Sequence, residues 1–335
     1  ETTGNVTKGS ITVSGNTASA LAGMNEAFNT LTVTGSNLLA RGLTVTAPTV
    51  GTVSSSGADF AVMNTQSGSG SAEASLNAGA SGFSSTGNFT AGSVTVNANS
   101  LLARASANTA NNTLTLAASN RLEASGVVNN LQQMADGATV KASIASTSAV
   151  GVELASTSGE AVVTVKDNMV TAQATGNVAN NALNASANNA ITAAGASGTP
   201  TFAVLNYQST GTSPSSPAYG VQSIINGISV GGSQLGGALN GGSATVAGNQ
   251  VLSVAYGNSA NNSVVVSALT PTLNTASASI TSVQYNLTSV TATIGNTTVQ
   301  ASGAAGSSGA NVGITGNSIV AMAVGNRSVN TITGR

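Results

Sequence analysis

Residues 163–185 read VTVKDNMVTAQATGNVANNALNA. Residues of one parity in this stretch are mostly apolar, in three groups: Val163 and Val165; Val170, Ala172 and Ala174; Ala179, Asn181, Leu183 and Ala185. A two-residue period is typical of a β-strand with one buried face, so the intervening Thr171, Gln173 and Thr175 are expected to face solvent. The phase changes at Asn168 and at Gly176-Asn177, where Asn and Gly tolerate the left-handed backbone of a tight corner. The stretch therefore predicts three short strands joined by two Asn corners.

This pattern recurs along the whole chain, which predicts one continuous repeat array over residues 1–335. Five Asn residues serve as origins, and Asn also stands nine and thirteen positions after each of them. The fifteen residues, taken as structural corner or ladder positions, are Asn16, Asn25, Asn29, Asn99, Asn108, Asn112, Asn168, Asn177, Asn181, Asn249, Asn258, Asn262, Asn317, Asn326 and Asn330. The motif copies lie near 11–33, 94–116, 163–185, 244–266 and 312–335.

The spacing of the copies suggests a larger unit. Successive origins are 83, 69, 81 and 68 residues apart, an alternation of long and short intervals. A second motif, FAVMNTQS at 60–67, recurs as FAVLNYQS at 202–209, and the short interval between them carries the looser VVNNLQ at 127–132. We therefore expect two double repeats, approximately 11–162 and 163–311, followed by the opening of a third.

Stacking of the copies is the fold that the repeat favours. Each copy alone would leave an apolar layer and open strand edges, whereas strands stacked in register pair along their length. The predicted fold class is all-β, a β-solenoid or stacked β-arch architecture with Asn corners; the alternative is a tandem array of β-sandwich modules, whose usual aromatic core is missing. The stretches 209–217 and 231–242 are rich in Gly, Ser and Pro and are expected to be loops.

The Asn residues allow two interpretations. The one thirteen positions after each origin is expected to point inward, where an unpaired amide would be costly, so a hydrogen-bonded ladder of equivalent amides is favoured there. At the corners, Asn could equally mark a turn and nothing more.

Composition excludes most catalytic and ligand-binding classes. The chain has no His and no Cys, and charged residues make up only 5% of it, so a His general base, a thiolate, an ordinary transition-metal site and a nucleic-acid-binding basic patch are all excluded. No apolar run is long enough for a transmembrane helix. Glu153 and Glu160 could form a carboxylate pair, but an ordinary solvated face explains them better. We therefore predict no enzyme activity, no catalytic or metal residues and no cofactor.

The Asn-rich repeat resembles a known class of fibre protein. Gly-Asn-x-Ala-x-Asn-x followed by Leu or Val stands at 176–183 and 257–264, and the related 325–332 has Ser328 at the Ala position. These segments are similar to the repeats of secreted bacterial subunits of the curlin and Fap functional-amyloid type. The resemblance implies an extracellular β-rich filament of biofilm matrix or attachment.

Two functions of different kinds follow. The first is a non-enzymatic structural protein whose partner is itself: residues 312–335 correspond to 11–34, so the last motif of one chain could be continued head-to-tail by the next. The second is the stalk or passenger of an adhesin that binds a host or carbohydrate surface, with few aromatic residues to form such a surface: Phe60, Phe202, Tyr207, Tyr219 and Tyr256. The chain begins at Glu1, which we interpret as a secreted or cell-surface protein whose leader is removed, or as a fragment.

Overall fold

The computed structural model describes residues 2–40, 58–77, 82–145, 149–154, 159–192, 200–211, 220–235, 239–269, 275–303 and 307–334. These residues form β-strands and no α-helix, and every pairing between named strands is parallel. The expectation of an all-β protein with stacked sheets is confirmed. A tandem array of Ig-like sandwiches does not fit, because those sheets are antiparallel.

One side of the molecule, the first layer, consists of two sheets. The shorter strands, in sheet order, are β2 (Ser10–Ser14), β8 (Ser93–Asn97), β13 (Val162–Lys166), β19 (Ser243–Ala247) and β24 (Asn311–Thr315). The longer strands are β3 (Thr17–Leu39), β9 (Ser100–Glu123), β14 (Met169–Ala187), β20 (Gln250–Ala268) and β25 (Ser318–Gly334), with the short β15 (Ala190–Ile191) also paired to β9. Each sheet therefore has one strand from each motif copy.

The facing side, the second layer, consists of three sheets of four strands. The first contains β4 (Phe60–Gly68), β10 (Gly126–Met134), β16 (Phe202–Thr210) and β21 (Ala278–Asn286). The second contains β5 (Ser71–Leu76), β11 (Thr139–Ala145), β17 (Gly220–Asn226) and β22 (Ser289–Gly295), and the third contains β6 (Phe83–Ser85), β12 (Ala149–Leu154), β18 (Ser229–Ser233) and β23 (Thr298–Ala301). A separate pair joins β1 (Val6–Thr7) to β7 (Phe89–Thr90).

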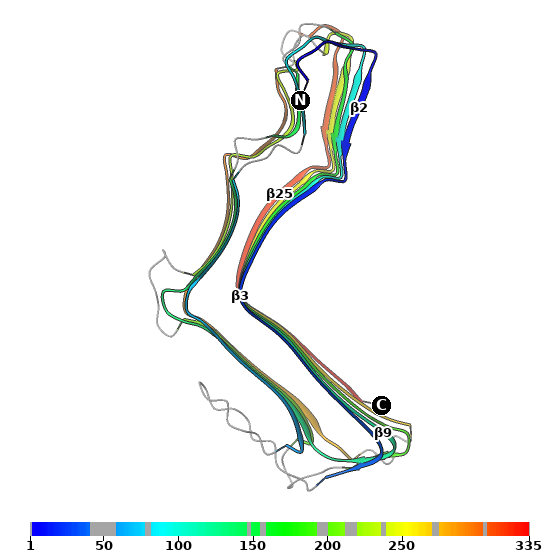
Figure 1. Cartoon of the computed structure of the whole chain (residues 1–335), viewed down its shortest axis with the longest axis vertical. Helices are drawn as coiled ribbons and strands as arrows, with labels where there is room; N and C mark the ends of the chain where they lie inside the picture. Colours follow the sequence, from blue (N-terminus) through cyan, green and yellow to red (C-terminus); the bar gives the residue numbers. More distant parts are fainter. Residues whose placement is uncertain are drawn as a thin grey trace.

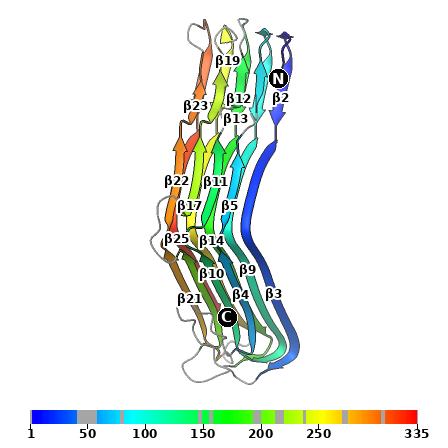
Figure 2. The same cartoon turned by 60° about the vertical axis from the view of Figure 1, so that its left-hand side comes forward.

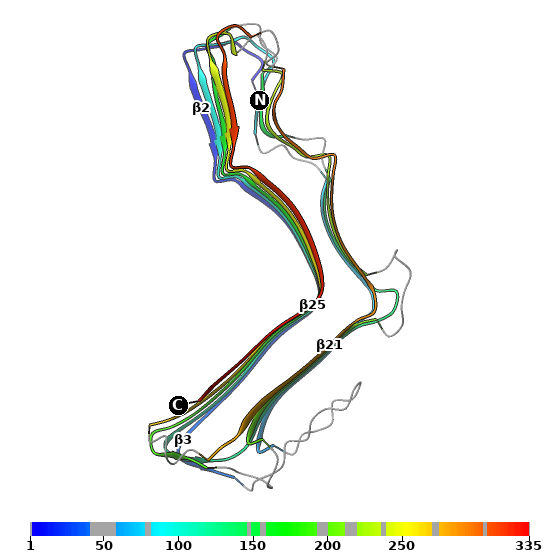
Figure 3. The same ribbon diagram turned by 180° about the vertical axis from the view of Figure 1, so that it is seen from behind.

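Viewed along its shortest axis, the molecule shows the copies superimposed on one another, with the two layers following the same bends (Figure 1, and from behind in Figure 3). From the side, equivalent strands run next to one another in chain order from β2 and β3 to β22, β23 and β25 (Figure 2).

Each interval between origins, long or short, contributes one strand to each sheet of the second layer. β10, from a short interval, pairs in full register with β4 and β16 from the two long intervals, so Asn130 lies between Asn64 and Asn206. The alternation in length comes from the connections: β9 and β10 are separated by two residues, whereas 40–59 separate β3 from β4.

Among the described residues, three apolar clusters combine side chains from both layers, and a fourth, smaller one of Val127, Ala203 and Leu205 lies in the second layer alone. In β13 and β14, for example, Val165 belongs to one cluster, Ala172 to the second and Leu183 to the third. Asn168 separates the first cluster from the second along the chain, and Asn177 and Asn181 separate the second from the third. Small apolar side chains thus alternate with bands of buried amides.

The inward parity read from residues 163–185 is confirmed, since all nine of the residues expected to face inward are buried. Thr171 and Gln173 are partly exposed as expected, but the expectation for Thr175 is wrong, because its side chain is only 4% exposed. Thr175 directly precedes Gly176, where the strand changes phase and the methyl group of Thr210 from β16 lies close by. At this phase change, both sides of the strand are covered.

The Asn corners differ from expectation in two ways. At the first, the left-handed residue is the one before each origin Asn, with φ of 67° at Gly15, 53° at Ala98, 55° at Asp167, 65° at Gly248 and 64° at Gly316. At the second, no corner separates two strands: β14 runs on through Gly176 and Asn177. The origin Asn therefore contributes its side chain to the corner, while its neighbour provides the turn.

The two expected loops are partly strand. Ser209 and Thr210 end β16, and 212–217 lie outside the described residues. Gly231 and Gly232 lie in β18, and 236–238 are likewise outside the described ranges. Glycine is required in β18, because a Cβ on Gly231 would lie 1.9 Å from the carbonyl oxygen of Gln300.

Candidate functional site

The origin Asn residues form a corner column that follows the stacking direction. Each Nδ2 donates to the Oδ1 of the next member at 2.9–3.0 Å, through Asn16, Asn99, Asn168, Asn249 and Asn317. The same oxygen also accepts a backbone N–H, as from Asn99 to Asn168 at 3.0 Å. The second Nδ2 hydrogen of Asn168 goes to the carbonyl of Val96 in the preceding copy. These residues hold adjacent copies together as well as occupying the corner.

The Asn nine positions further on forms a mid-strand column of shorter bonds. Nδ2 and Oδ1 are 2.7 Å apart at every step through Asn25, Asn108, Asn177, Asn258 and Asn326. The other Nδ2 hydrogen crosses to the second layer, where Asn177 donates to the carbonyl of Ser209 at 3.0 Å. Each buried amide in this column therefore ties its copy both to the next copy and to the facing layer.

The Asn thirteen positions on forms an inner column, with steps of 2.8 Å through Asn29, Asn112, Asn181, Asn262 and Asn330. Asn112, Asn181 and Asn262 are buried, at 0–2% exposure. Asn181 also donates across the layers to Asn206 at 3.3 Å.

Two further columns lie in the second layer, and sequence reasoning did not assign them a role. One runs through Asn64, Asn130, Asn206 and Ser282, at 2.7, 2.8 and 3.2 Å. The other, the Gln column, runs through Gln66, Gln132, Gln208 and Gln284 at 2.7–2.8 Å. In the sequence, these columns are marked by the pattern Asn-x-Gln, which recurs at 64–66, 130–132 and 206–208.

The Gln column points the other way from the three Asn columns of the first layer. Gln132 donates backward to Gln66, whereas Asn108 donates forward to Asn177. Gln132 also donates to the carbonyl of Val178, the residue after Asn177. Backbone carbonyls thus fix the orientation of both sets of amides, and each end of the stack presents amide groups of defined polarity.

Both ends of the stack expose strand edges. Among the described residues, β3 pairs only with β9, and β25 only with β20, so these end strands have a described neighbour on one side only. Apolar side chains that are buried in the middle copies are exposed there: Leu183 is fully buried, whereas Ile332, at the equivalent position in β25, is 53% exposed. Natural proteins usually protect such edges with charges, prolines or bulges.

Charged residues are scarce in the strands at these edges. The sequence has no charged residue between Asp167 and Arg327, so Arg327 is the only charge in β21 to β25. β3 likewise has a single charged residue, Glu26. The edge strands therefore have little electrostatic protection against pairing.

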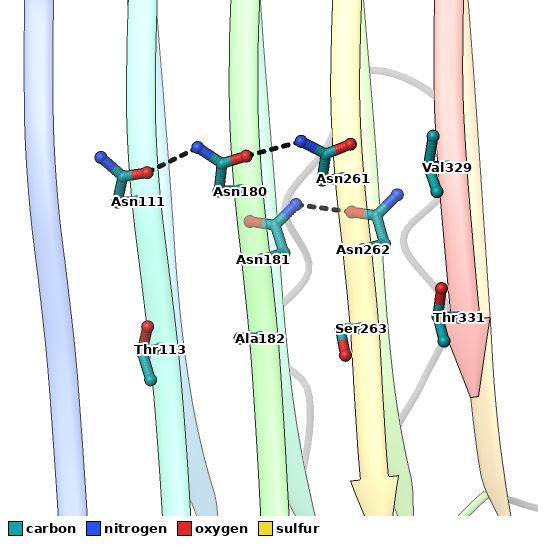
Figure 4. A pocket seen from close by; sticks show the side chains of 10 residues that line it. All are labelled: Asn111, Thr113, Asn180, Asn181, Ala182, Asn261, Asn262, Ser263, Val329 and Thr331. Atoms are coloured by element: carbon teal, nitrogen blue, oxygen red, sulfur yellow. Dashed lines mark hydrogen bonds between the residues drawn. The ribbon is translucent and has the colours of Figure 1, made fainter. Parts of the chain in front are cut away.

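The outer face of the first layer has a shallow trough of about 360 Å³. Its upper wall is an exposed amide row in which Asn180 donates to Asn111 at 2.7 Å and accepts from Asn261 at 3.0 Å (Figure 4). Ala182 and Ser263 lie between Thr113 and Thr331, and their small side chains make the hollow (Figure 4). The trough offers amide and hydroxyl groups beside the apolar side chains of Ala182 and Val329, without any charge.

The described residues contain two aromatic pairs, Phe83 with Phe89 and, on the second layer, Tyr207 with Tyr285. The rings of Tyr207 and Tyr285 lie 5.9 Å apart between centroids and are tilted by 50°. Burial, together with the nearby Tyr285 phenol, raises the pKa of Tyr207, while a hydrogen bond with Ser209 acts in the opposite direction. Tyr219, which the sequence suggested as another surface aromatic, lies outside the described residues.

The described part of the chain has no cluster of three or more Asp, Glu, His or Cys residues that could hold a metal ion. Glu153 accepts a hydrogen bond from Gln234, and Glu160 is exposed. Within the described ranges, no helix is long and apolar enough to cross a membrane.

Comparisons of the chain with protein-family models, curated proteins and solved structures found no match. The resemblance to curlin-type and Fap-type subunits thus stays a prediction.

Proposed function

We propose that the chain is a β-solenoid structural protein that assembles with copies of itself, end to end, into a filament outside the cell. The proposal is supported by one observation above all: among the described residues, both end strands present unpaired edges with the register and amide columns that already join the five copies within the chain. A second chain could add to such an edge through the contacts that hold the molecule together. No ligand, cofactor or catalytic group is required.

The first test is electron microscopy of the purified 335-residue chain, with X-ray diffraction of aligned material. Filaments with a meridional spacing of ~4.8 Å are expected, because the strands would stack along the filament axis. Single rods of the length of one molecule, even at high protein concentration, would contradict the proposal.

A matched pair of variants tests whether the β25 edge is used. Ile332→Lys puts a charge on the inward face of the edge, a device that blocks pairing in natural sheets. Thr331→Lys adds the same charge on the outward face of the same strand. Filament formation is expected to fail, or to slow strongly, only for Ile332→Lys, while circular dichroism confirms that both variants keep their β-structure.

A second candidate is the stalk of an adhesin, and the trough lined by Asn180 and Ser263 favours it. Its uncharged amide and hydroxyl groups suit the hydroxyl groups of a neutral polysaccharide. A glycan array read with the wild-type chain and with Ala182→Arg, which would fill the trough, tests this function. Binding that Ala182→Arg abolishes, in a chain that stays as dispersed rods, would favour the adhesin over the filament.

A further inference from the structure

The two end strands differ from the internal copies at the same few outward positions. The position after each mid-strand Asn is Thr109, Val178 or Ser259 in the three internal copies, but Glu26 in β3 and Arg327 in β25. The register makes Glu26 and Arg327 equivalent, and both side chains are exposed. The only charges of the two end strands therefore occupy the same position and have opposite signs.

A second outward position also distinguishes the end strands from the internal copies. Two positions further on, the internal copies have the exposed amide row Asn111, Asn180 and Asn261, whereas the end strands have Phe28 and Val329. Phe28 is 70% exposed and Val329 is 45% exposed. Because residues two apart lie on the same face of a strand, Phe28 lies next to Glu26, and Val329 lies next to Arg327.

Each Asn column of the first layer has an acceptor end on the β3 side of the stack and a donor end on the β25 side. Among the described residues, Oδ1 of Asn25 accepts no hydrogen bond. At the other end, Asn326 uses one Nδ2 hydrogen for the carbonyl of Gln284, and its second has no described partner. An acceptor at the β3 edge therefore matches a donor at the β25 edge.

We infer that the β3 edge of one chain joins the β25 edge of a second copy in the internal register, with Glu26 beside Arg327 and Phe28 beside Val329. This junction rests on the proposed self-assembly and specifies its partner strands and direction. Asn326 donates to Asn25 across it, as Asn258 donates to Asn326 within one chain. Paired residues on adjacent strands have Cβ atoms about 5 Å apart, which brings the carboxylate and guanidinium within reach of an ion pair.

Junctions between like ends are disfavoured. Two β25 edges would bring together two Arg327 side chains and two sets of amide donors, and two β3 edges would bring together two Glu26 side chains and two sets of acceptors. The contact is placed in the first layer, where each of the two sheets has one strand from each of the five copies. The second-layer sheets have four strands each. At this junction, one strand position therefore separates β21 of the first chain from β4 of the second chain, whereas β25 and β3 are direct neighbours.

Charge exchange tests the pairing. Glu26→Arg and Arg327→Glu each place like charges beside one another, and each is expected to slow seeded filament growth roughly tenfold at low salt, the rate change that about 1.4 kcal/mol produces. High salt should reduce the difference, because exposed charges are screened. The double variant restores opposite charges, and its growth rate should return to within about threefold of wild type. Glu160→Arg, an exposed charge change of the same size away from both edges, is the control and should leave growth unchanged.

A seeding experiment tests the direction. Filament seeds made from the Arg327→Glu variant should accept Glu26→Arg chains at their β25 ends faster than they accept wild-type chains. The inferred junction would be overturned if the single variants grew as fast as wild type, or if the double variant did not recover the wild-type growth rate. Either result would leave the proposed function standing. A wild-type chain that forms no filaments at all would overturn both.

Discussion

Gln132 on β10 donates through Nε2 to the backbone carbonyl of Val178 on β14, at 2.9 Å. In the opposite direction, Asn177, the neighbour of Val178, donates through Nδ2 to the carbonyl of Ser209 on β16, at 3.0 Å. The two layers are therefore joined by reciprocal side-chain-to-backbone bonds, in addition to their apolar contacts. Because the amides also bond along the stack, a single substitution in a column affects three copies at once.

Removal of a mid-strand amide should be costly. Asn177→Ala leaves the Nδ2 group of Asn108, the Oδ1 of Asn258 and the carbonyl of Ser209 each without one partner. An unsatisfied buried group costs about 1–3 kcal/mol, so the free energy of unfolding should fall by about 3 kcal/mol or more. Urea unfolding followed by circular dichroism measures the change. Asn180→Ala, in the exposed amide row of the same strand, is the control and should change stability by less than about 0.5 kcal/mol.

Close stacking of glycines should make Gly151 intolerant of a side chain. A Cβ at this position would lie 1.7 Å from the carbonyl oxygen of Gly231 on the neighbouring strand. We expect Gly151→Ala to destabilise the protein by about 1–3 kcal/mol or more, since backbone must move to accept the methyl group. Gly70→Ala is the comparison, because nothing lies within 4 Å of the added Cβ there. Thermal unfolding of the two variants should differ clearly, and equal melting temperatures would show that the strands separate more easily than their packing indicates.

Completion of the second-layer Asn column should stabilise the fold. Ser282 ends this column and accepts from Asn206 at 3.2 Å. Asn at position 282 would supply Oδ1 both to Asn206 and to Asn262, as Asn206 does for Asn130 and Asn181. We expect Ser282→Asn to raise the free energy of unfolding by about 1 kcal/mol, the usual net value of a hydrogen bond. Ser282→Ala should lower it, and a variant pair with the opposite order would refute the column as a stabilising element.

Tyr207 should make stability sensitive to alkaline pH. Its pKa is raised in the folded protein, so the neutral phenol is favoured there and the unfolded chain ionises first. The contribution of Tyr207 to the free energy of unfolding is complete below the pKa of about 10 in the unfolded chain, and it is lost as pH rises through the pKa in the folded protein. The unfolding midpoint should therefore fall more steeply above about pH 10 in wild type than in Tyr207→Phe. In addition, Tyr285→Phe should lower the pKa of Tyr207 in a spectrophotometric titration, because the neighbouring phenolate is removed.

Much of the first layer could be predicted from the repeat. The two-residue parity of 163–185 correctly placed Val170, Leu183 and Asn181 on the inward face. The column positions also followed from spacing, because stacked copies must put equivalent residues side by side. Local sequence was less informative about turns. The residue with the left-handed backbone, for example Ala98 or Asp167, comes one position before the repeated origin Asn.

The contacts between layers could not be predicted in this way. Gln132 and Val178 are 46 residues apart, and no short-range pattern relates them. The burial of Thr175 has the same origin, since parity assigns one face of a strand to the core but does not show what covers the other face.

The sequence by itself determined that this protein is built from repeated strands with in-register asparagines, because periodicity and spacing are local properties of the chain. Only the tertiary structure decided that long and short intervals alike contribute one strand to each sheet of the second layer, that the Gln column opposes the Asn columns, and that Glu26 and Arg327 occupy equivalent positions at opposite ends. Those facts depend on which strands pair and which layers face each other, and pairing is settled by the joint burial of distant segments.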